Sequence, residues 1–210
     1  IIQKSNYEEI EKRDMKKPVR RENLAISPRL AKIMINLSES DENNKLVDAF
    51  CGIGVVLQEA LLRDIKVIGV DNDKEAIEGA KKNLKWFGFP EKNYTLIYGD
   101  SGKVKIENVQ ALVSEPDFGK TLKKTPSKQD AGLMIKNFER LIINVLNNMK
   151  KHVSGRFVFT TPFINIGKQR IGCDFEKISV KTGLKLVRGF PIAEFRENQI
   201  VGRNIAVLIK

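Results

Sequence analysis

The sequence predicts an α/β fold: a mostly parallel, seven-stranded sheet with helices on both faces and an antiparallel hairpin strand at the C-terminus. Two observations predict it. Short apolar runs alternate with segments of helical periodicity between residues 46 and 182. The apolar stretches 184–192 and 200–209 then follow with no room for a helix between them. Alternation indicates parallel strands joined by right-handed crossovers, whereas two adjacent strands indicate a hairpin.

The first 26 residues stand apart from this pattern. They carry many charges of both signs and few apolar side chains, so we expect an arm or linker over 1–26 and one folded domain over 27–210. Ser27 and Pro28 are typical of a helix start, since serine caps the first turn and proline fits its first position. The apolar residues expected on the inner face of this helix are Leu30, Ile33, Met34 and Leu37.

The alternating elements follow in order. Strands are expected over 46–50, 66–71, 94–98, 110–114 and 153–161, with helices after the first, second, fourth and fifth of them. Asp73 and Ser127 are the expected N-caps of two helices, and Asp130 occupies the capping-box position after Ser127. The apolar face expected for the long helix comprises Met134, Phe138, Leu141, Val145 and Met149.

The net charge of +11 is confined to one half of the chain. Residues 1–100 carry 17 basic and 17 acidic side chains, whereas residues 101–210 carry 20 basic and 9 acidic ones. A basic half joined to a neutral half indicates that one half meets a polyanion such as a nucleic acid. A solvated, lysine-rich surface is the alternative interpretation.

Histidine and cysteine usage narrows the chemistry. With His152 as the single histidine, catalytic triads and histidine-ligated metal sites are not expected, and we predict no metal. Cys51 and Cys173 form neither a disulfide framework nor a zinc spacing, which fits a reducing, cytoplasmic compartment. No apolar run approaches the ~20 residues of a membrane-spanning helix, so we expect no membrane partner.

The loop Asp48–Gly54 joins the first strand to its helix through Gly52 and Gly54. Ligands of parallel sheets bind at the carboxyl ends of strands, and glycine lets the backbone turn tightly and a ligand approach it closely. Tight turns also need glycine without any ligand, and Leu57 replaces the third glycine of the dinucleotide-binding pattern. The glycines alone are therefore weak evidence.

Acidic residues at three successive strand ends strengthen that evidence. These are Asp48, Asp71 and Asp100. Asp71 lies 19 residues after Gly52, where an acid can accept both hydroxyl protons of a ribose, and Asp100 is placed to accept from an adenine amino group. An acid-rich crevice repels pyrophosphate but suits S-adenosylmethionine, which combines a ribose, an adenine and a positive charge.

These residues carry a resemblance. The segments Asp48–Gly54 and Ser114–Gly119, together with Asp71, resemble class I S-adenosylmethionine-dependent methyltransferases that modify amino groups. The segments 27–37 and 50–52 narrow the resemblance to archaeal-type tRNA guanine-N2 methyltransferases, over about residues 20–210. It implies the Rossmann-like fold of class I methyltransferases. In that family an RNA-binding THUMP domain precedes the catalytic domain; none is evident here, so we expect a fragment, a missing partner or a lineage that works without it.

The resemblance also implies the site. The residues expected to bind S-adenosylmethionine are Asp48, Phe50, Cys51, Gly52, Gly54, Asp71, Asn72, Asp100 and Ser101. The residues expected to act on the substrate are Glu115, Pro116, Asp117 and Phe118. In the family, an acidic or amide oxygen and the proline carbonyl accept the two protons of a base amine. This turns the nitrogen lone pair toward the sulfonium methyl, while an aromatic ring stacks on the flipped base.

Glu115-Pro116-Asp117-Phe118 departs from the family pattern of Asp or Asn followed by two prolines and an aromatic residue. Some relatives use a Glu-Pro-aromatic form, in which Asp117 would replace the aromatic residue. Either alignment leaves Glu115 and Pro116 as amine acceptors and Phe118 as the stacking ring. Asp117 accepts a substrate hydrogen bond, or it marks altered substrate choice or lost activity.

The implied substrate is RNA, and tRNA above all, bound by the basic C-terminal half. Two alternatives remain: a DNA methyltransferase acting on adenine N6 or cytosine N4, and a non-catalytic RNA-binding or scaffolding module. The basic residues expected to face the nucleic acid are Lys120, Lys123, Lys124, Lys128, Lys150, Lys151, Arg156, Lys168 and Arg170. Phe163 offers a second aromatic face or belongs to the core.

Overall fold

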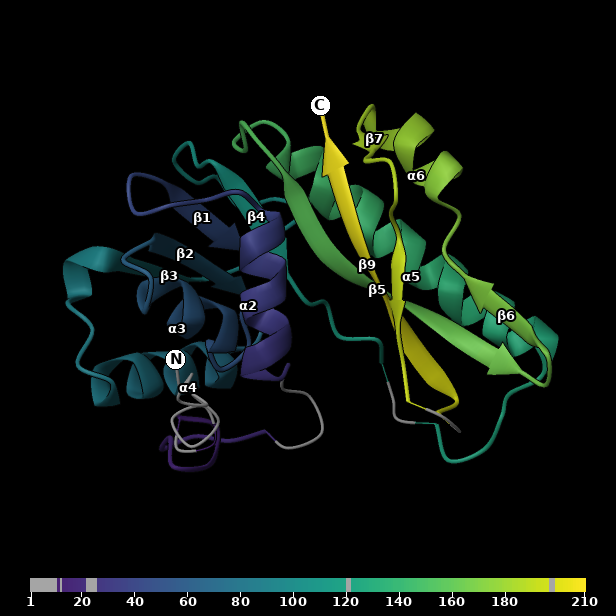
Figure 1. Cartoon of the computed structure of the whole chain (residues 1–210), viewed down its shortest axis with the longest axis horizontal. Coiled ribbons are helices and arrows are strands. Elements are labelled where there is room, and N and C mark those ends of the chain that lie inside the picture. The colour runs from purple at the N-terminus through teal and green to yellow at the C-terminus, as the bar shows by residue number, and fades with distance from the viewer. Residues whose placement is uncertain (1–10, 12, 22–25, 120–121, 197–198) are drawn as a thin grey trace, which may run out of the picture.

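The structure is a computed structural model that describes residues 11, 13–21, 26–119, 122–196 and 199–210. Over these residues a nine-stranded sheet lies between two layers of helices (Figure 1). The strands are β1 (Lys45–Asp48), β2 (Lys66–Asp71), β3 (Tyr94–Tyr98), β4 (Ala111–Ser114), β5 (Phe157–Ile166), β6 (Gln169–Gly172), β7 (Lys185–Leu186), β8 (Ile192–Glu194) and β9 (Val201–Ile209). The helices are α2 (Pro28–Leu37), α3 (Val55–Leu61), α4 (Lys74–Trp86), the short 3₁₀ helix η1 (Glu91–Asn93), α5 (Lys128–Met149) and α6 (Phe175–Thr182).

The main path through the sheet runs β3-β2-β1-β4-β5-β9-β7. Strands β1 to β5 are parallel, and β9 is antiparallel to both β5 and β7, between which it is inserted. These seven strands confirm the predicted mixed sheet with its antiparallel C-terminal strand. Strands β6 and β8 are short additions along β5 and β9 that the sequence analysis did not anticipate.

Local sequence determines where the helices begin. The Ser27 hydroxyl accepts from the Leu30 amide at the start of α2, and the Asp73 carboxylate accepts from two amides at the start of α4. At the start of α5 the Ser127 hydroxyl accepts from the Asp130 amide and donates to the Asp130 carboxylate at 2.7 Å. All three predicted N-caps are therefore confirmed.

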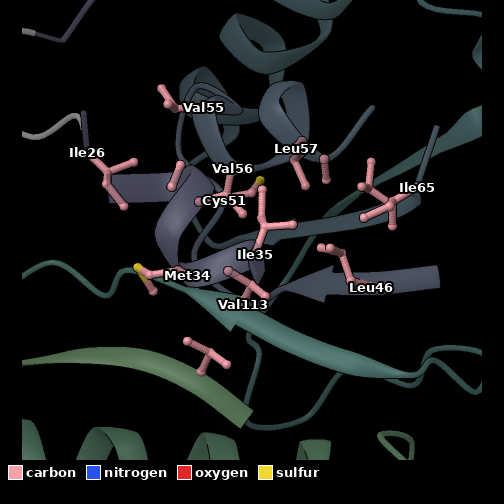
Figure 2. Packing of buried hydrophobic residues seen from close by; sticks show 14 of the residues in the cluster. Ile26, Met34, Ile35, Leu46, Cys51, Val55, Val56, Leu57, Ile65 and Val113 are labelled. Carbon is pink, nitrogen blue, oxygen red and sulfur yellow. The ribbon is translucent and has the colours of Figure 1, made fainter. Parts of the chain in front are cut away.

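Two apolar clusters fill the space on either side of the sheet. Helices α2, α3 and α4 cover one face (Figure 2), and α5 and α6 cover the other. Successive residues of β5 alternate between them: Phe157 and Phe159 face α5, whereas Val158 faces α2. Because both faces are covered, the central strands are almost wholly apolar.

Three sequence-based predictions were wrong in detail. Ile33 and Leu141 are 45% and 41% exposed, because the buried faces of their helices pass instead through Ile35 and Ile142. The fifth strand begins at Phe157 and not at residue 153, since Val153 forms only an isolated bridge with Val109 and the chain then bends before β5. It also extends to Ile166, where it pairs with β6.

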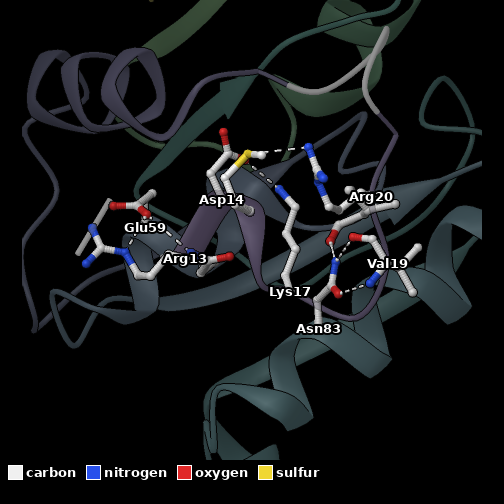
Figure 3. Close-up of polar contacts among 10 residues, drawn as sticks. Arg13, Asp14, Lys17, Val19, Arg20, Glu59 and Asn83 are labelled. Carbon is white, nitrogen blue, oxygen red and sulfur yellow. Dashed lines mark hydrogen bonds and ion pairs between the residues drawn. The ribbon is translucent and has the colours of Figure 1, made fainter. Parts of the chain in front are cut away.

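The described part of the arm, residues 13–21, packs against α3 and α4 (Figure 3). The Asn83 side chain on α4 accepts from the Val19 amide at 2.9 Å and donates to the Val19 carbonyl at 3.1 Å. Arg13 pairs with the fully buried Glu59 of α3 at 3.4 Å. The boundary between arm and domain at residues 26 and 27 stays a prediction.

Two kinds of feature are absent from the described ranges. None of the helices there has the length and apolar character needed to cross a bilayer. In the same part of the chain, no three side chains of the histidine, cysteine, aspartate or glutamate type are grouped as ligands of one metal ion.

Candidate active site at the carboxyl ends of the strands

A cavity of about 790 Å³ lies at the carboxyl ends of β1, β2, β4 and β5, where β9 begins. Its walls include the loop after β1 and the segment after β4, so the two motifs that the sequence analysis singled out meet in one place. Of the predicted site residues, those lining the cavity are Asp48, Phe50, Cys51, Gly52, Asp71, Asn72, Glu115, Pro116, Asp117 and Phe118.

The glycine loop turns through two left-handed residues, Gly52 with φ of 50° and Gly54 with φ of 89°. A Cβ on Gly54 would lie 3.3 Å from the Ala80 Cβ of α4, so this position needs glycine for both its backbone angle and its packing. A Cβ on Gly52 would meet no atom within 4 Å, although Gly52 lines the cavity. The loop therefore presents bare backbone to a ligand.

Asp71, at the end of β2, is joined to this loop. Its Oδ2 accepts from the Gly52 amide at 2.8 Å, and its Oδ1 accepts from the Asp73 amide at 2.9 Å. Each carboxylate oxygen retains a further lone pair, and the residue lines the cavity next to the exposed Asn72. The same carboxylate can thus order the loop and accept from ligand hydroxyls.

Asp48 is buried beneath the loop. Its Oδ1 accepts from the Ser114 hydroxyl at 2.6 Å and from the Phe50 amide at 3.1 Å. Burial raises the pKa of Asp48 to about 7, against the lowering effect of these two hydrogen bonds. A positively charged ligand in the cavity would favour the ionised form of this carboxyl.

Cys51 contributes packing. Its thiol is buried, and burial together with the nearby Asp48 and Asp71 carboxylates raises its pKa well above the ordinary value. The thiol therefore stays neutral near pH 7 and is a poor nucleophile.

Gly54, Asp100 and Ser101 do not line the cavity. The Asp100 carboxylate accepts from the Gly102 amide at 2.8 Å and pairs with Lys103 at 3.3 Å. The buried Ser101 hydroxyl donates to the carbonyl of Ala49, which attaches this turn to the glycine loop. For Asp100 and Ser101, direct contact with the cofactor stays a prediction.

Glu115 follows β4 and is largely buried, with 13% of its side chain exposed. Burial raises its pKa to about 7; the Arg203 guanidinium opposes this rise and the Glu194 carboxylate adds to it. Pro116 is buried beside it and also lines the cavity. A proton acceptor thus lies opposite the glycine loop.

Asp117 and Phe118 have different surroundings. The exposed Asp117 carboxylate accepts from the Gly119 amide at 2.9 Å, and Gly119 has φ of 90°, so the aspartate caps a tight turn. Phe118 packs edge-on against Phe138 of α5 at 5.7 Å between ring centroids, and it also lines the cavity. The turn gives Asp117 a structural role in place of the second proline.

The sequence analysis missed several lining residues, of which Arg203 matters most. Its guanidinium contacts the Glu115 carboxylate at 2.9 Å. No local pattern marks it, because the contact depends on the pairing of β9 with β5, which the sequence does not reveal. Others that were missed include Arg21, Ile26, Met134, Ile135 and Gln199.

The basic residues fall into two groups. Lys123, Lys124 and Lys128 follow the Glu115 motif. Lys168 lies in the turn between β5 and β6, and Arg170 lies on β6; both are beyond the carboxyl end of β4. Lys150, Lys151 and Arg156 precede β5 and so lie at the opposite edge of the sheet; their expected place on the substrate side is wrong. Phe163 is 2% exposed and belongs to the core. Lys120 falls outside the described residues.

These residues fit S-adenosylmethionine. A bare glycine turn and acidic side chains at the ends of β1, β2 and β4 enclose a cavity whose volume is typical of small-molecule sites. The carboxylates of Asp48, Asp71 and Glu115 suit a ligand that carries hydroxyls and a positive charge.

Sequence comparisons place the chain among methyltransferases. A tRNA (guanine(10)-N2)-dimethyltransferase from Pyrococcus abyssi is 31% identical over 143 residues, which is 66% of this chain and 39% of that protein. The corresponding protein from Methanothermobacter thermautotrophicus is 35% identical over 96 residues, 45% of this chain and 28% of that protein. The chain thus spans well under half the length of these two relatives.

Solved structures agree with the fold. TrmN from Thermus thermophilus superposes with a TM-score of 0.62 at 17% identity, covering 88% of this chain and 49% of that one. TYW2 from M. jannaschii, solved in complex with AdoMet, gives 0.56 at 16% identity, covering 87% and 75%. These likenesses confirm the predicted Rossmann-like fold of class I methyltransferases.

The family comparison covers more than half of the chain. Residues 17–162 match the RMKL-like methyltransferase domain, a segment that includes both the glycine loop and the Glu115 motif. This match agrees with the predicted cofactor, S-adenosylmethionine. The chain belongs to the RMKL-like methyltransferase domain family.

Proposed function

We propose that this domain transfers a methyl group from S-adenosylmethionine to an exocyclic amine of an RNA base, with guanine N2 of tRNA as the target. The observation that carries the proposal is the cavity shared by the glycine loop after β1 and the Glu115-Pro116 segment after β4. One segment suits the methyl donor and the other suits an amine, so the cavity can hold both reactants.

The cofactor would lie against the loop after β1. Gly52 lets it approach the backbone, Asp71 accepts from its ribose hydroxyls, and Asp48 supplies negative charge beneath the loop. When bound, S-adenosylmethionine would supply an electrophilic methyl group on a sulfonium centre; transfer of this group to the amine would break its carbon–sulfur bond and leave a neutral thioether. The protein's own residues need only bind, orient and accept protons.

Glu115 and Pro116 act on the amine. A base amine is a weak nucleophile because its lone pair is delocalised into the ring. The Glu115 carboxylate and the Pro116 carbonyl accept the two N–H groups, which directs the lone pair toward the methyl group. The ionised Glu115 carboxylate is a stronger acceptor of an N–H group than the neutral carboxyl, and its pKa of about 7 places the ionised form near physiological pH.

Two observations support RNA as the substrate. The two relatives described above carry names that state methylation of guanine 10 of tRNA at N2. The basic residues Lys123, Lys124, Lys128, Lys168 and Arg170 lie on the side of the sheet where Glu115 lies. Phe118, at the cavity wall, is the ring proposed to stack on the target base.

The test is methyl transfer from isotopically labelled S-adenosylmethionine to an unmodified tRNA transcript, followed by mass spectrometry of the nucleosides. We expect N2-methylguanosine with the natural protein and a loss on the order of a hundredfold in kcat with Glu115→Ala, which removes the acceptor oxygen. Asp71→Asn should weaken cofactor binding in calorimetry. Glu42→Gln, in an exposed loop, is the matched control. Cofactor binding without transfer to any RNA would contradict the proposal, and transfer to duplex DNA in competition with tRNA would redirect it.

A further inference from the structure

Strand β9 brings a cation to the proposed amine acceptor. In the antiparallel sheet Arg203 stands opposite Pro162 of β5 on one side and Glu194 of β8 on the other. From this position its guanidinium reaches Glu115, which lies 88 residues earlier in the chain. The preceding residue is Gly202, where a Cβ would come within 2.2 Å of the Phe163 ring, so the backbone of β9 lies close against β5 here.

The guanidinium uses separate nitrogens for two carboxylates. Nη1 lies 2.9 Å from Oε1 of Glu115, and Nε lies 3.4 Å from Oε2 of Glu194. The exposed fractions of the side chains are 31% for Arg203, 13% for Glu115 and 50% for Glu194. The contact with Glu115 is made through Oε1. Because Oε2 has no partner among the described residues, Oε2 is the oxygen left for a substrate amine.

Charged groups face Glu115 from several elements. Arg203 on β9 favours its ionised form, and Glu194 on β8 disfavours it. Asp48, buried at the end of β1, and Glu115 also repel each other. The exposed Asp117 is two positions along the same segment, but its carboxylate accepts from the Gly119 amide. Burial favours the protonated form of Glu115, which is the weaker acceptor, and Arg203 is the cation that opposes this effect of burial.

We propose that Arg203 is a positioning residue of the methyl-transfer reaction: it holds Oε1 of Glu115 and keeps the carboxylate ionised, so that Oε2 faces the amine. Glu194 holds the guanidinium on its other side. This role rests on the proposed function, because it assigns Arg203 a task in the same reaction. Unlike a lysine, an arginine offers separate donors in a planar fork and can hold both carboxylates in one orientation.

The first experiment needs no activity. Glutamate is labelled with ¹³C at Cδ, the Glu115 signal is assigned by its loss in Glu115→Gln, and its titration is followed by NMR in each variant. We expect Arg203→Met to raise the midpoint of Glu115 and Glu194→Gln to lower it. Arg203→Lys should leave the midpoint near that of the natural protein, because the charge remains. Arg63→Met is the matched control, since Arg63 hydrogen-bonds Asn36 on α2, at the far end of α3 from the glycine loop.

The second experiment measures the pH dependence of kcat for methyl transfer to tRNA. The acidic limb of the pH profile of kcat should move to higher pH in Arg203→Met and to lower pH in Glu194→Gln, in the same directions as the NMR midpoints. Arg203→Lys should keep the limb but lose about tenfold in plateau kcat, because a single ammonium cannot orient the carboxylate as the fork does. The KM for S-adenosylmethionine should stay within about twofold. Among the described residues Arg203 pairs with Glu115 and Glu194, and not with the glycine loop that we propose binds the cofactor.

The outcomes separate the two proposals. Opposite NMR shifts in a protein that methylates no RNA would uphold the ion pair and reject the proposed function, and with it the reaction role of Arg203. RNA methylation with unmoved midpoints and an unmoved acidic limb would reject the positioning role alone. A rise in KM for tRNA with no change in the limb would show that Arg203 contacts the nucleic acid instead. If Arg203→Met does not fold, Arg203→Lys and Glu194→Gln still decide the matter.

Discussion

The Ser114 hydroxyl donates to the Asp48 carboxylate at 2.6 Å and accepts from the Phe50 amide at 3.1 Å. Ser114 is the last residue of β4 and leads into Glu115, whereas Asp48 is the last residue of β1 and leads into the glycine loop. One buried hydroxyl therefore joins the two segments that we propose bind the amine and the methyl donor.

Replacing this hydroxyl by Ser114→Ala should destabilise the fold by about 1–3 kcal/mol, because a buried carboxylate loses a donor. The loss should be larger at pH 8 than at pH 5, since Asp48 with a pKa of about 7 is ionised only at the higher pH. Urea unfolding at both pH values measures it. Ser154→Ala, which removes a hydroxyl near the surface, is the control; an equal loss at both pH values would contradict the assignment to Asp48.

Asp48→Asn should make the protein more stable at pH 8. The folded-state pKa is about 7 against an ordinary 3.8, so between these values the folded protein binds more protons than the unfolded chain, and its stability falls as pH rises. A shift of about three units corresponds to at most about 4 kcal/mol. Thermal unfolding should show that the stability of the variant relative to the natural protein increases from about pH 4 to about pH 7. Above about pH 7 the difference between the two should stay constant. A constant difference would argue against the raised pKa.

Gly54→Ala and Gly132→Ala should have opposite effects. At Gly54 an alanine must adopt φ near 89° with its Cβ 3.3 Å from Ala80, which we expect to cost about 1–2 kcal/mol and to weaken cofactor binding. At Gly132, inside α5, the added Cβ meets open space and should stabilise the helix by about 0.5–1 kcal/mol. Chemical unfolding and calorimetry with S-adenosylmethionine measure both; unchanged affinity in Gly54→Ala would speak against the loop's role.

Asn83→Ala should release the arm. The Asn83 amide exchanges two hydrogen bonds with Val19 and donates a third to the Ile53 carbonyl in the glycine loop at 3.0 Å. Its loss leaves the partly buried N–H and carbonyl of Val19 and the buried carbonyl of Ile53 without this partner, at a cost of about 2–3 kcal/mol. Limited proteolysis should cut residues 13–21 faster, whereas Asn137→Ala on the exposed side of α5 should not change the rate. Equal cleavage of both variants would mean that other contacts hold the arm.

The salt dependence of tRNA binding should distinguish the two edges of the sheet. If Lys123, Lys124 and Lys128 each meet a phosphate, their joint replacement by alanine should reduce the log–log salt slope by about 2, at roughly 0.7 per contact. Lys151→Ala, at the opposite edge, should leave the slope unchanged. Filter binding over a salt series tests this, and an equal effect from Lys151 would place the RNA elsewhere.

The sequence was sufficient for features encoded locally and insufficient for those that depend on pairing. Ser27, Asp73 and Ser127 predict helix starts because a cap involves only its own first turn. Acids at strand ends predict one shared edge because parallel strands leave their carboxyl ends together. The contact between Arg203 and Glu115 could not be predicted, since it depends on β9 entering between β5 and β7. The position of Arg156 was wrong for a related reason: a residue before a parallel strand lies at the edge opposite the residues after it.

The place of β9 in the sheet has a consequence for synthesis. Both proposed binding segments lie before residue 120 and leave the ribosome before β9. The cation that pairs with Glu115 is in the strand made after every other described element. Until residues 201–209 have entered between β5 and β7, Glu115 lies in the nascent chain without its arginine. Completion of the proposed active site is thereby coupled to completion of the sheet.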